Sequence, residues 1–257
     1  MVTIKKPEEI KILRQAGHLL AEVLRQVAER AKPGVAFFEL DQLAEKRILE
    51  AGAQPSFKDY RPRFSDTAFP SSLCVSVNNE VVHGMGNRKT VLKEGDIVGL
   101  DLGLKLQGLF VDHAVTVGVG KISKEAARLI KVTRQSLETG LKKVKPGNFI
   151  HDISGAVQKH VEKAGFSVVR DLVGHGVGYA IHEDPRIPNF VPDKGPTELV
   201  QIQAGMVLAI EPMVNAGSWK VATAQDGWTV LTEDSSWSAH FEHTVVVTAR
   251  GCEILTI

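Results

Sequence analysis

Apolar residues recur every three or four positions in two segments of each half of the chain. This spacing places them on one face of an α-helix, so four amphipathic helices are predicted. Ser123 has a hydroxyl that can accept a hydrogen bond from a free backbone amide, and we expect it to cap the third helix. The four apolar stripes are Ile10, Leu13, Leu20, Leu24, Val27 and Ala28; Leu40, Leu43, Ala44 and Ile48; Leu129, Ile130, Leu137 and Leu141; and Ile150, Ile153, Val157 and Val161.

In both halves, similar short motifs flank the second helical segment. Residues 32–52 begin K-P-G and end E-A-G, and residues 145–165 begin K-P-G and end K-A-G. The step from Pro33 to Gly52 is nineteen residues, as is the step from Pro146 to Gly165. Self-similarity of this kind indicates an internal duplication.

Each half continues into β-like sequence with a carboxylate at the same place. Asp101 ends E-G-D-I-V-G-L-D and Glu211 ends A-G-M-V-L-A-I-E, each six residues after a glycine. Asp112 lies in V-D-H-A-V-T-V and Glu242 in F-E-H-T-V-V-V. We therefore predict one α+β domain over residues 1–257. In it, pseudo-symmetric halves, about 1–120 and 121–257, share a curved antiparallel sheet backed by helices.

The runs that contain Asp101 and Glu211 are apolar enough to be buried, where an isolated carboxylate is costly unless it is neutralised, paired or bound to metal. If residues 98–115 form a hairpin that turns near residues 106–108, Asp101 lies opposite Asp112. Opposed residues have Cβ atoms ~4.5–5.5 Å apart, so the two carboxylates would repel each other without a cation. With Glu211 and Glu242 added by symmetry, the sequence predicts a dinuclear cation site.

A softer ligand could come from G-H-G-V-G, where glycines flank His175 and leave its imidazole unobstructed. On the residues alone, His175 can equally be a structural histidine. One nitrogen and four carboxylates suit Mn²⁺, Fe²⁺, Co²⁺ or Zn²⁺. The chain has no H-E-x-x-H motif, which disfavours zincin chemistry, and no G-x-S-x-G elbow, which disfavours the commonest serine hydrolases.

Composition narrows the class of protein further. With 43% apolar and 24% charged residues, the chain suits a soluble globular protein, and its net charge of +1 argues against dedicated DNA binding. Cys74 and Cys252 cannot form a disulfide framework, which favours a reducing compartment. No signal peptide and no apolar run of ~20 residues is present, so we expect a cytoplasmic protein that does not enter membranes.

Nearly the whole chain resembles the type I methionine aminopeptidases, hydrolases of the pita-bread fold. The motifs that carry the resemblance occur in order: S-V-N-N-E-V-V-H-G, G-D-I-V-x-L-D, G-H-G-V-G, A-I-E-P-M-V-N-A-G, D-G-W-T-V and F-E-H-T-V-V-V-T. The resemblance implies removal of the initiator methionine from nascent proteins whose next residue is small. It also implies two divalent ions, drawn from cobalt, manganese, iron, zinc and nickel.

The same resemblance assigns the ligands residue by residue. Asp112 and Glu242 would bridge both ions, His175 and Glu211 would complete one of them, and Asp101 would chelate the other. A water between the ions would be deprotonated and would attack the carbonyl after methionine, with Glu211 as the proton shuttle.

The resemblance further implies that His83 and His182 reach the substrate, His83 at the scissile amide and His182 at the oxyanion. Phe69, Cys74 and Trp228 would line the methionine pocket, although Trp228 by itself could equally be a core residue.

The chain departs from the family pattern at three positions. Ile181 and Asp66 stand where the best-known relatives carry aromatic residues, and Gly99 replaces a polar residue that commonly helps to bind a monovalent cation. These departures put the shape of the pocket and that accessory cation in doubt, while the reaction is unaffected.

Three alternatives remain. A prolidase or aminopeptidase P would usually carry an additional N-terminal domain. A type II methionine aminopeptidase would carry a long insertion, for which the twenty-eight residues between His182 and Glu211 leave no room. An inactive pita-bread binding module would have lost ligands. We also expect a monomer, with transient contact to the ribosome implied by the resemblance alone.

Overall fold

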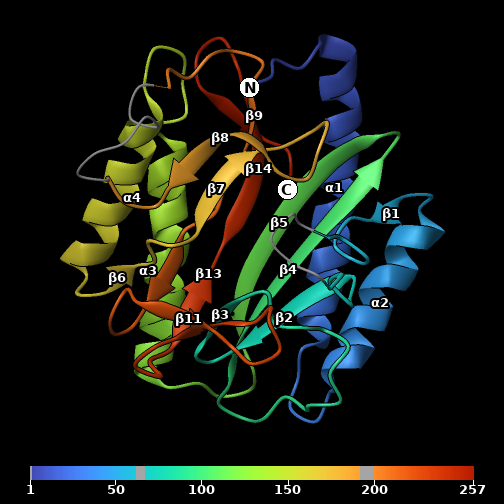
Figure 1. Ribbon diagram of the computed structural model, residues 1–257, viewed down its shortest axis with the longest axis vertical. Coiled ribbons are helices and arrows are strands. Elements are labelled where there is room, and N and C mark those ends of the chain that lie inside the picture. Colours follow the sequence, from blue (N-terminus) through green and yellow to red (C-terminus); the bar gives the residue numbers. More distant parts are fainter. Residues whose placement is uncertain (1, 62–66, 192–199) are drawn as a thin grey trace.

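The computed structural model describes residues 2–61, 67–191 and 200–257 (Figure 1). The four predicted helices are present: α1 (Pro7–Arg30), α2 (Phe37–Glu50), α3 (Lys124–Leu141) and α4 (Ile150–Lys163). Ser123 caps α3 as expected, because its side chain accepts a hydrogen bond from the Ala126 amide at 3.0 Å. Within the described residues, no helix is long and apolar enough to cross a membrane.

Antiparallel pairing joins the described strands into one large sheet and two three-stranded ones. The large sheet runs β1-β4-β5-β14-β9-β7-β8, with β2 paired to β4 and β15 to β14. The small sheets run β13-β10-β6 and β11-β12-β3. The strands are β1 (Gln54–Pro55), β2 (Leu73–Val77), β3 (Glu80–Val82), β4 (Ile97–Leu106), β5 (Leu109–Gly118), β6 (Ser167–Val168), β7 (Val173–Gly176), β8 (Glu183–Pro188), β9 (Val207–Ile210), β10 (Met213–Asn215), β11 (Val221–Thr223), β12 (Val230–Thr232), β13 (Ser238–His240), β14 (Glu242–Val247) and β15 (Cys252–Ile254).

The middle of the large sheet has the symmetry that the duplication predicts. Its four central strands run β4-β5-β14-β9, so that β4 and β5 from the first half stand beside β14 and β9 from the second. The halves meet where β5 pairs with β14, with Glu242 opposite Ala114 and His243 opposite His113. The equivalent acids of the two halves thus come from equivalent strands.

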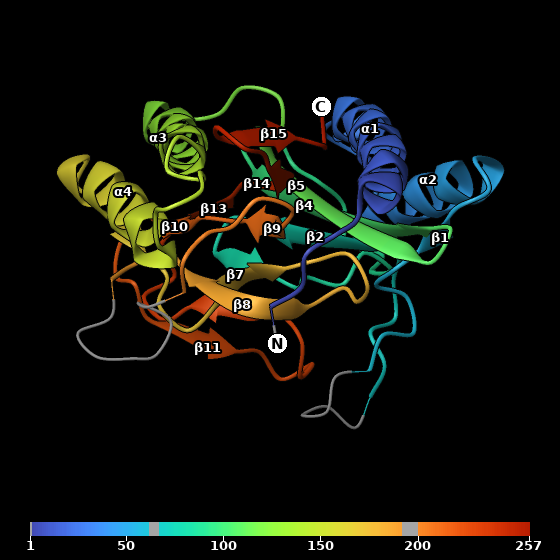
Figure 2. The same ribbon diagram turned by 90° about the horizontal axis from the view of Figure 1, so that it is seen from above.

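Helices cover one face of this sheet. α1 and α2 lie over the first half and α3 and α4 over the second, which leaves the opposite, concave face to the site (Figure 2). The largest core cluster joins Leu13 and Leu20 of α1 to Leu100 and Leu102 of β4, all fully buried. Because side chains alternate along a strand, the odd-numbered residues of β4, Asp101 among them, point away from the helices.

The predicted register of the β4–β5 hairpin was wrong by two residues. Asp101 lies opposite Ala114, and Asp112 lies opposite Gly103. The turn is a tight two-residue loop of Gln107 and Gly108, which moves its centre one residue beyond the predicted midpoint. Both turn residues have positive φ, 49° and 88°, the backbone conformation that two-residue hairpin turns require. The shift is an even number of residues, so Asp101 and Asp112 still share the concave face.

Candidate metal centre and substrate pocket

Strand register brings the five predicted ligands to one face of the sheet. Asp101, Asp112 and Glu242 share it, because Asp101 and Glu242 both lie opposite Ala114 and Asp112 is two residues from that alanine. His175 lies opposite Ala209, two residues before Glu211 on the same strand path. In the order of the strands, the ligands follow one another as Asp101, Asp112, Glu242, Glu211 and His175.

Three members of this row can hold a metal ion. Ligand atoms of Asp112, Glu242 and His175 lie within 4.8 Å of one another, and all three residues are buried. His175 Nε2 lies 3.4 Å from Glu211 Oε1. The neighbours of the aspartates in the hairpin are small, since Asp101 faces Ala114 and Asp112 faces Gly103.

The imidazole of His175 is held in the orientation that a ligand needs. Its Nδ1 lies 2.9 Å from the carbonyl oxygen of Gly176, so this nitrogen carries the proton and Nε2 faces the carboxylates. The flanking glycines have a packing role: a Cβ on Gly174 would lie 2.5 Å from the carbonyl oxygen of Ala209, and one on Gly176 would lie 2.2 Å from that of Asp184. No other residue allows this approach of β7 to its neighbours.

Without a bound cation, the ionised forms of these carboxylates are disfavoured. Burial raises the pKa of Glu211 to about 8, and burial, partly offset by His240, raises that of Asp101 to about 6. Burial and the neighbouring carboxylates raise the pKa values of Asp112 and Glu242 well above their ordinary range. Divalent ions would reverse these shifts by favouring the charged carboxylates.

The donor set fits such ions on a second ground. Buried oxygens of Asp101 and Glu242 have no hydrogen-bond partner. Buried polar atoms are nearly always satisfied, so each unpaired atom here is a free acceptor aimed into the site. Four carboxylates and one imidazole suit a pair of first-row divalent ions.

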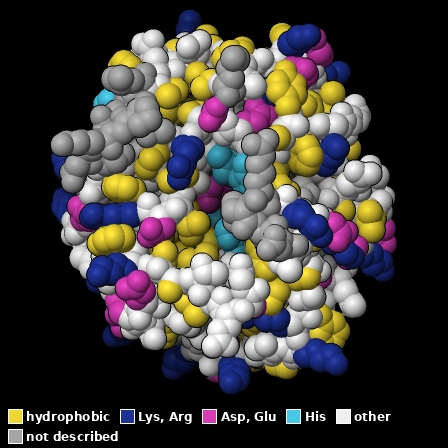
Figure 3. All heavy atoms as spheres, in the orientation of Figure 1, with side chains coloured by type: hydrophobic (Ala, Val, Ile, Leu, Met, Phe, Trp, Pro, Cys, Tyr) yellow, Lys and Arg dark blue, Asp and Glu magenta, His cyan; other side chains and the backbone are white. Residues whose placement is uncertain are grey.

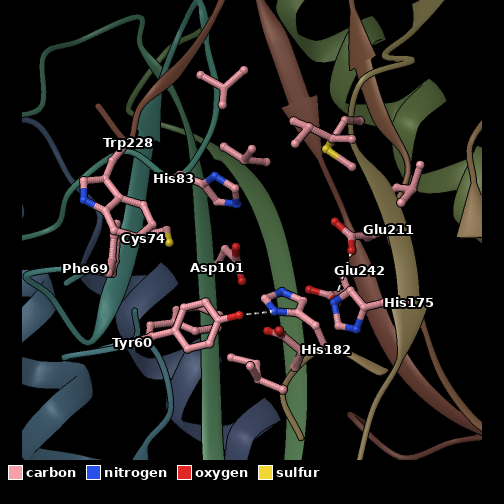
Figure 4. A pocket seen from close by; sticks show the side chains of 18 of the residues that line it. Tyr60, Phe69, Cys74, His83, Asp101, His175, His182, Glu211, Trp228 and Glu242 are labelled. Carbon is pink, nitrogen blue, oxygen red and sulfur yellow. Dashed lines mark hydrogen bonds and ion pairs between the residues drawn. The ribbon is translucent and has the colours of Figure 1, made fainter. Parts of the chain in front are cut away.

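A cavity of about 470 Å³ lies over the ligand row. Histidine and acidic side chains are visible at the bottom of a hollow in this face (Figure 3). On one side of it, Phe69, Cys74 and Trp228 form an apolar wall (Figure 4). The Phe69 and Trp228 rings pack edge to face with centroids 5.2 Å apart, and the Trp228 indole donates to Thr67 Oγ1 at 3.2 Å. This wall can receive an apolar side chain.

The two predicted substrate-facing histidines line the same cavity. His182 Nδ1 lies 3.0 Å from the Tyr60 hydroxyl, and its ring packs edge to face on His175 with centroids 4.5 Å apart (Figure 4). Burial lowers the pKa of His182. Burial also lowers the pKa of His83 to about 4, so this imidazole is neutral at pH 7.

His83 is held in an unusual backbone conformation, with φ of 58°. A left-handed conformation is uncommon for a residue with a side chain and persists only where its surroundings enforce it. The next residue does so: Gly84 O accepts from the Val75 amide at 2.7 Å, and Gly84 N donates to Ser76 Oγ at 3.1 Å. The loop after β3 is thus fixed to β2, and His83 points into the cavity (Figure 4).

Sequence reasoning missed two residues of this site. Tyr60 lines the cavity and contacts His182, but it lies in none of the motifs that the sequence offers. His240 lies behind the ligands with its Nε2 3.6 Å from Glu211 Oε2, and this nitrogen has no hydrogen-bond partner. His240 is two residues before Glu242. It could have been predicted only from the bend between β13 and β14, and the hydropathy pattern does not indicate that bend.

The three departures from the family pattern have different outcomes. Ile181 lines the cavity, with 5% of its surface exposed. Gly99 lies opposite Thr116 in β5 and Ser76 in β2. Asp66 lies outside the described residues.

Comparisons with known proteins agree with this geometry. Residues 11–249 match the model of metallopeptidase family M24. Methionine aminopeptidases from Clostridium perfringens and Bacillus subtilis are each 49% identical to this chain, with 100% of the chain and 99% of each relative covered.

Solved structures give the same result. The methionine aminopeptidase from Thermotoga maritima superposes with a TM-score of 0.93 at 44% identity, covering 100% of this chain and 99% of the other. The prolidase from Pyrococcus horikoshii superposes at 0.78 with 20% identity and 63% of its own chain covered, which is a likeness of fold. The chain belongs to metallopeptidase family M24 and, within that family, to the methionine aminopeptidases.

Proposed function

We propose that this chain is a two-metal aminopeptidase that removes the initiator methionine when the next residue is small. The observation that carries the proposal is the row of five ligands across neighbouring strands, in which Asp112 and Glu242 lie between Asp101 on one side and Glu211 with His175 on the other. This placement between the two outer sets supports a bridging role for both carboxylates. Asp101 on one side, and Glu211 with His175 on the other, would each complete a single ion.

Divalent ions bound there would supply an acidified water and Lewis acidity toward the scissile carbonyl. The chain's own groups then orient the substrate and move protons. Glu211 lies beside His175 and faces the cavity, where it can take a proton from the attacking water and deliver it to the leaving amine. Manganese, iron, cobalt, zinc and nickel are all compatible with this donor set.

His182 is the proposed donor to the oxyanion. If the Tyr60 hydroxyl donates to His182 Nδ1, the proton of the neutral imidazole is on Nε2 and can be donated to the substrate. A donor placed at the developing oxyanion contributes about 3–4 kcal/mol of transition-state stabilisation in other hydrolases. His83 would contact the scissile amide from the opposite wall.

Methionine selectivity is assigned to the apolar wall. Phe69, Cys74 and Trp228 would enclose the thioether side chain, and Ile181 and Tyr60 line the same cavity. Sulfur and aromatic rings attract each other by about 0.3–1.5 kcal/mol, which favours methionine over an aliphatic chain of the same length. The substrates would be nascent chains in the cytoplasm, acted on by a monomer with transient contact to the ribosome.

Turnover of a Met-Ala-Ser peptide by EDTA-treated protein supplied with Mn²⁺, Fe²⁺ or Co²⁺ tests the function. We expect release of free methionine with at least one metal and none without metal. Absence of turnover with every metal by protein that is folded by circular dichroism would favour a binding module instead. Preferential cleavage of an Xaa-Pro peptide would favour the prolidase alternative.

A further inference from the structure

Residues 2–6, here called the N-terminal arm, cross from the start of α1 to β7 and β8 (Figures 1 and 2). The arm is fixed by its backbone, because the Lys5 amide donates to the carbonyl oxygen of Gly205 at 2.8 Å. Residues 177–182 connect β7 to β8 and are here called the His182 loop. The arm lies against this loop, and none of its residues lines the substrate cavity.

A buried ion pair ties the arm to the residue that follows His182. Lys5 Nζ lies 2.7 Å from Glu183 Oε2, and the two side chains are only 1% and 8% exposed. Thr3 Oγ1 donates to the same oxygen at 2.5 Å and itself accepts from Lys5 Nζ. A buried ion pair is poor evidence for stability by itself, since desolvation offsets much of its attraction. This ion pair matters here because the Glu183 carboxylate also binds the His182 loop.

The other oxygen of Glu183 organises the loop. Glu183 Oε1 accepts hydrogen bonds from the amides of Tyr179 and Ala180, the latter at 3.0 Å. One carboxylate therefore joins two side chains of the arm to two backbone amides of the His182 loop. Charge-assisted bonds of this kind are about twice as strong as neutral ones and fix the geometry of the groups they join.

The loop is also shaped to fit the arm. A Cβ on Gly178 would lie 2.3 Å from Lys5 Cε, and Gly178 has a φ of 139° that disfavours any side chain. Lys5 Nζ lies 4.8 Å from the centre of the Tyr179 ring, whose hydroxyl donates to Glu9 of α1 at 2.7 Å. The loop thus meets both the arm and the first turn of α1.

The ring of His182 contacts His175 edge to face and bonds to Tyr60. Its backbone belongs to the loop that Glu183, the next residue, ties to the arm. The position of the ring therefore depends on this loop as well as on its two ring contacts. We propose that the N-terminal arm is part of the active site, with Lys5 and Glu183 as positioning residues that hold His182 at the substrate. This inference rests on the oxyanion role of His182 in the proposed function.

Lys5→Met tests the proposal, because it keeps the apolar stem of the side chain and removes the ammonium group. We expect kcat on Met-Ala-Ser to fall roughly ten- to hundredfold, as small misplacements of a catalytic group do, while KM and bound metal change less than twofold. Thr3→Val, a milder change, should give a smaller fall in kcat. It keeps the test usable if Lys5→Met does not fold.

A double-mutant cycle separates positioning from general destabilisation. In a His182→Ala background, Lys5→Met should change kcat less than twofold, because the group that it positions is already absent. The loss in Tm caused by Lys5→Met should be equal in both backgrounds. An equal fall in kcat with and without His182 would overturn the proposal, as would an unchanged kcat in the single variant.

Arg14→Met is the matched control, since it breaks an ion pair between α1 and Glu253 with an N–O distance of 2.6 Å, elsewhere on the molecule. We expect it to leave kcat unchanged. Hydrogen–deuterium exchange at Tyr179 and Ala180 should accelerate in Lys5→Met and stay slow in Arg14→Met. Accelerated exchange with unchanged kcat would show an arm that orders the loop without positioning His182, contrary to the proposal.

The cycle also distinguishes failure of the inference from failure of the proposed function. If wild-type protein does not release methionine, the proposed function fails. If wild-type protein is active and His182→Ala keeps full kcat, the oxyanion role fails and the arm positions no catalytic group. If His182→Ala is impaired and Lys5→Met is not, only the inference about the arm is overturned.

Discussion

Asp101 and Asp112 are diagonal neighbours on the concave face of the β4–β5 hairpin, with Asp101 opposite Ala114 and Asp112 opposite Gly103. Such neighbours have Cα atoms about 7–8 Å apart, which is close enough for both carboxylates to reach one ion. Asp112 also stands next to Glu242 in the strand order, whereas Asp101 is at the end of the ligand row.

The two aspartates should therefore differ in their effect on metal binding. We expect Asp112→Asn to lower occupancy of both ions and Asp101→Asn to lower occupancy of one, as measured by calorimetric titration with Mn²⁺. Glu22→Gln, on an exposed part of α1, is the control and should bind as wild type does. Equal loss of a single ion in both aspartate variants would contradict a bridging role for Asp112.

Much of this site follows from sequence alone, because duplication and side-chain alternation are local rules. The equivalence of Asp101 with Glu211, and of Asp112 with Glu242, predicts the four carboxylates on one sheet face, where the structure places them. The exact pairing of β4 with β5 could not be predicted from the sequence. The position of the turn depends on the left-handed backbone of Gln107, and a glutamine does not signal that conformation in a sequence. The division into domain halves near residue 120 stays a prediction.

Three other residues of the site, His175, Tyr60 and His240, are harder to predict from the sequence. In the sequence, only the flanking glycines draw attention to His175. These glycines are needed because Gly174 and Gly176 lie close to neighbouring backbones. Tyr60 and His240 reach the site through a loop and a strand bend, and both depend on tertiary packing that no local period encodes.

Glu211 links the stability of metal-free protein to pH. Burial raises its pKa from 4.5 to about 8, so the folded protein holds this proton more tightly than the unfolded chain does. The resulting stabilisation is fully present below the unfolded pKa and is lost as the pH rises through the folded one. We expect the Tm of EDTA-treated protein to fall between about pH 5 and about pH 8.5, and to fall less in Glu211→Gln.

Metal-saturated protein should lack this part of the pH dependence, because bound cations favour the ionised carboxylate. An EDTA-treated Glu211→Gln variant whose Tm falls as steeply as that of the wild type would show that Glu211 is not the group responsible.

His240 is expected to position Glu211 without binding metal. Its Nε2 lies 3.6 Å from Glu211 Oε2, and it stands outside the ligand row. Replacement of a residue that orients a metal ligand typically costs about 10–100-fold in activity or affinity. We expect His240→Leu to lower kcat by about tenfold with two ions still bound, and His240→Gln, which restores a donor, to recover part of the rate. Loss of an ion in His240→Leu would instead make His240 a ligand.

Tyr60→Phe should separate the hydroxyl from the ring. The ring stays in the cavity wall, but the 3.0 Å contact to His182 Nδ1 is lost. A hydrogen bond of this kind contributes about 1 kcal/mol, so we expect kcat to fall about fivefold, less than in His182→Ala, with bound metal unchanged. A Tyr60→Phe variant as impaired as His182→Ala would mean that the hydroxyl acts directly on the substrate.

Trp228 and Phe69 should determine selectivity for methionine. Trp228→Ala removes one of two rings packed 5.2 Å apart and opens the apolar wall. We expect KM for Met-Ala-Ser to rise and the preference for methionine over leucine at the first position to fall by about tenfold, the range that one hydrophobic contact provides. Thr67→Val, which removes only the partner of the indole N–H, should change selectivity less.

Anomalous diffraction from crystals of the Mn²⁺-loaded protein would show how many metal ions the site binds and where. We expect two peaks at the manganese edge. One should lie among Asp112, Glu242, His175 and Glu211, and the other should be shared by Asp101 with the same two bridging carboxylates. A single peak at full loading, or peaks coordinated by residues outside this row, would show that the chain does not form this two-metal centre.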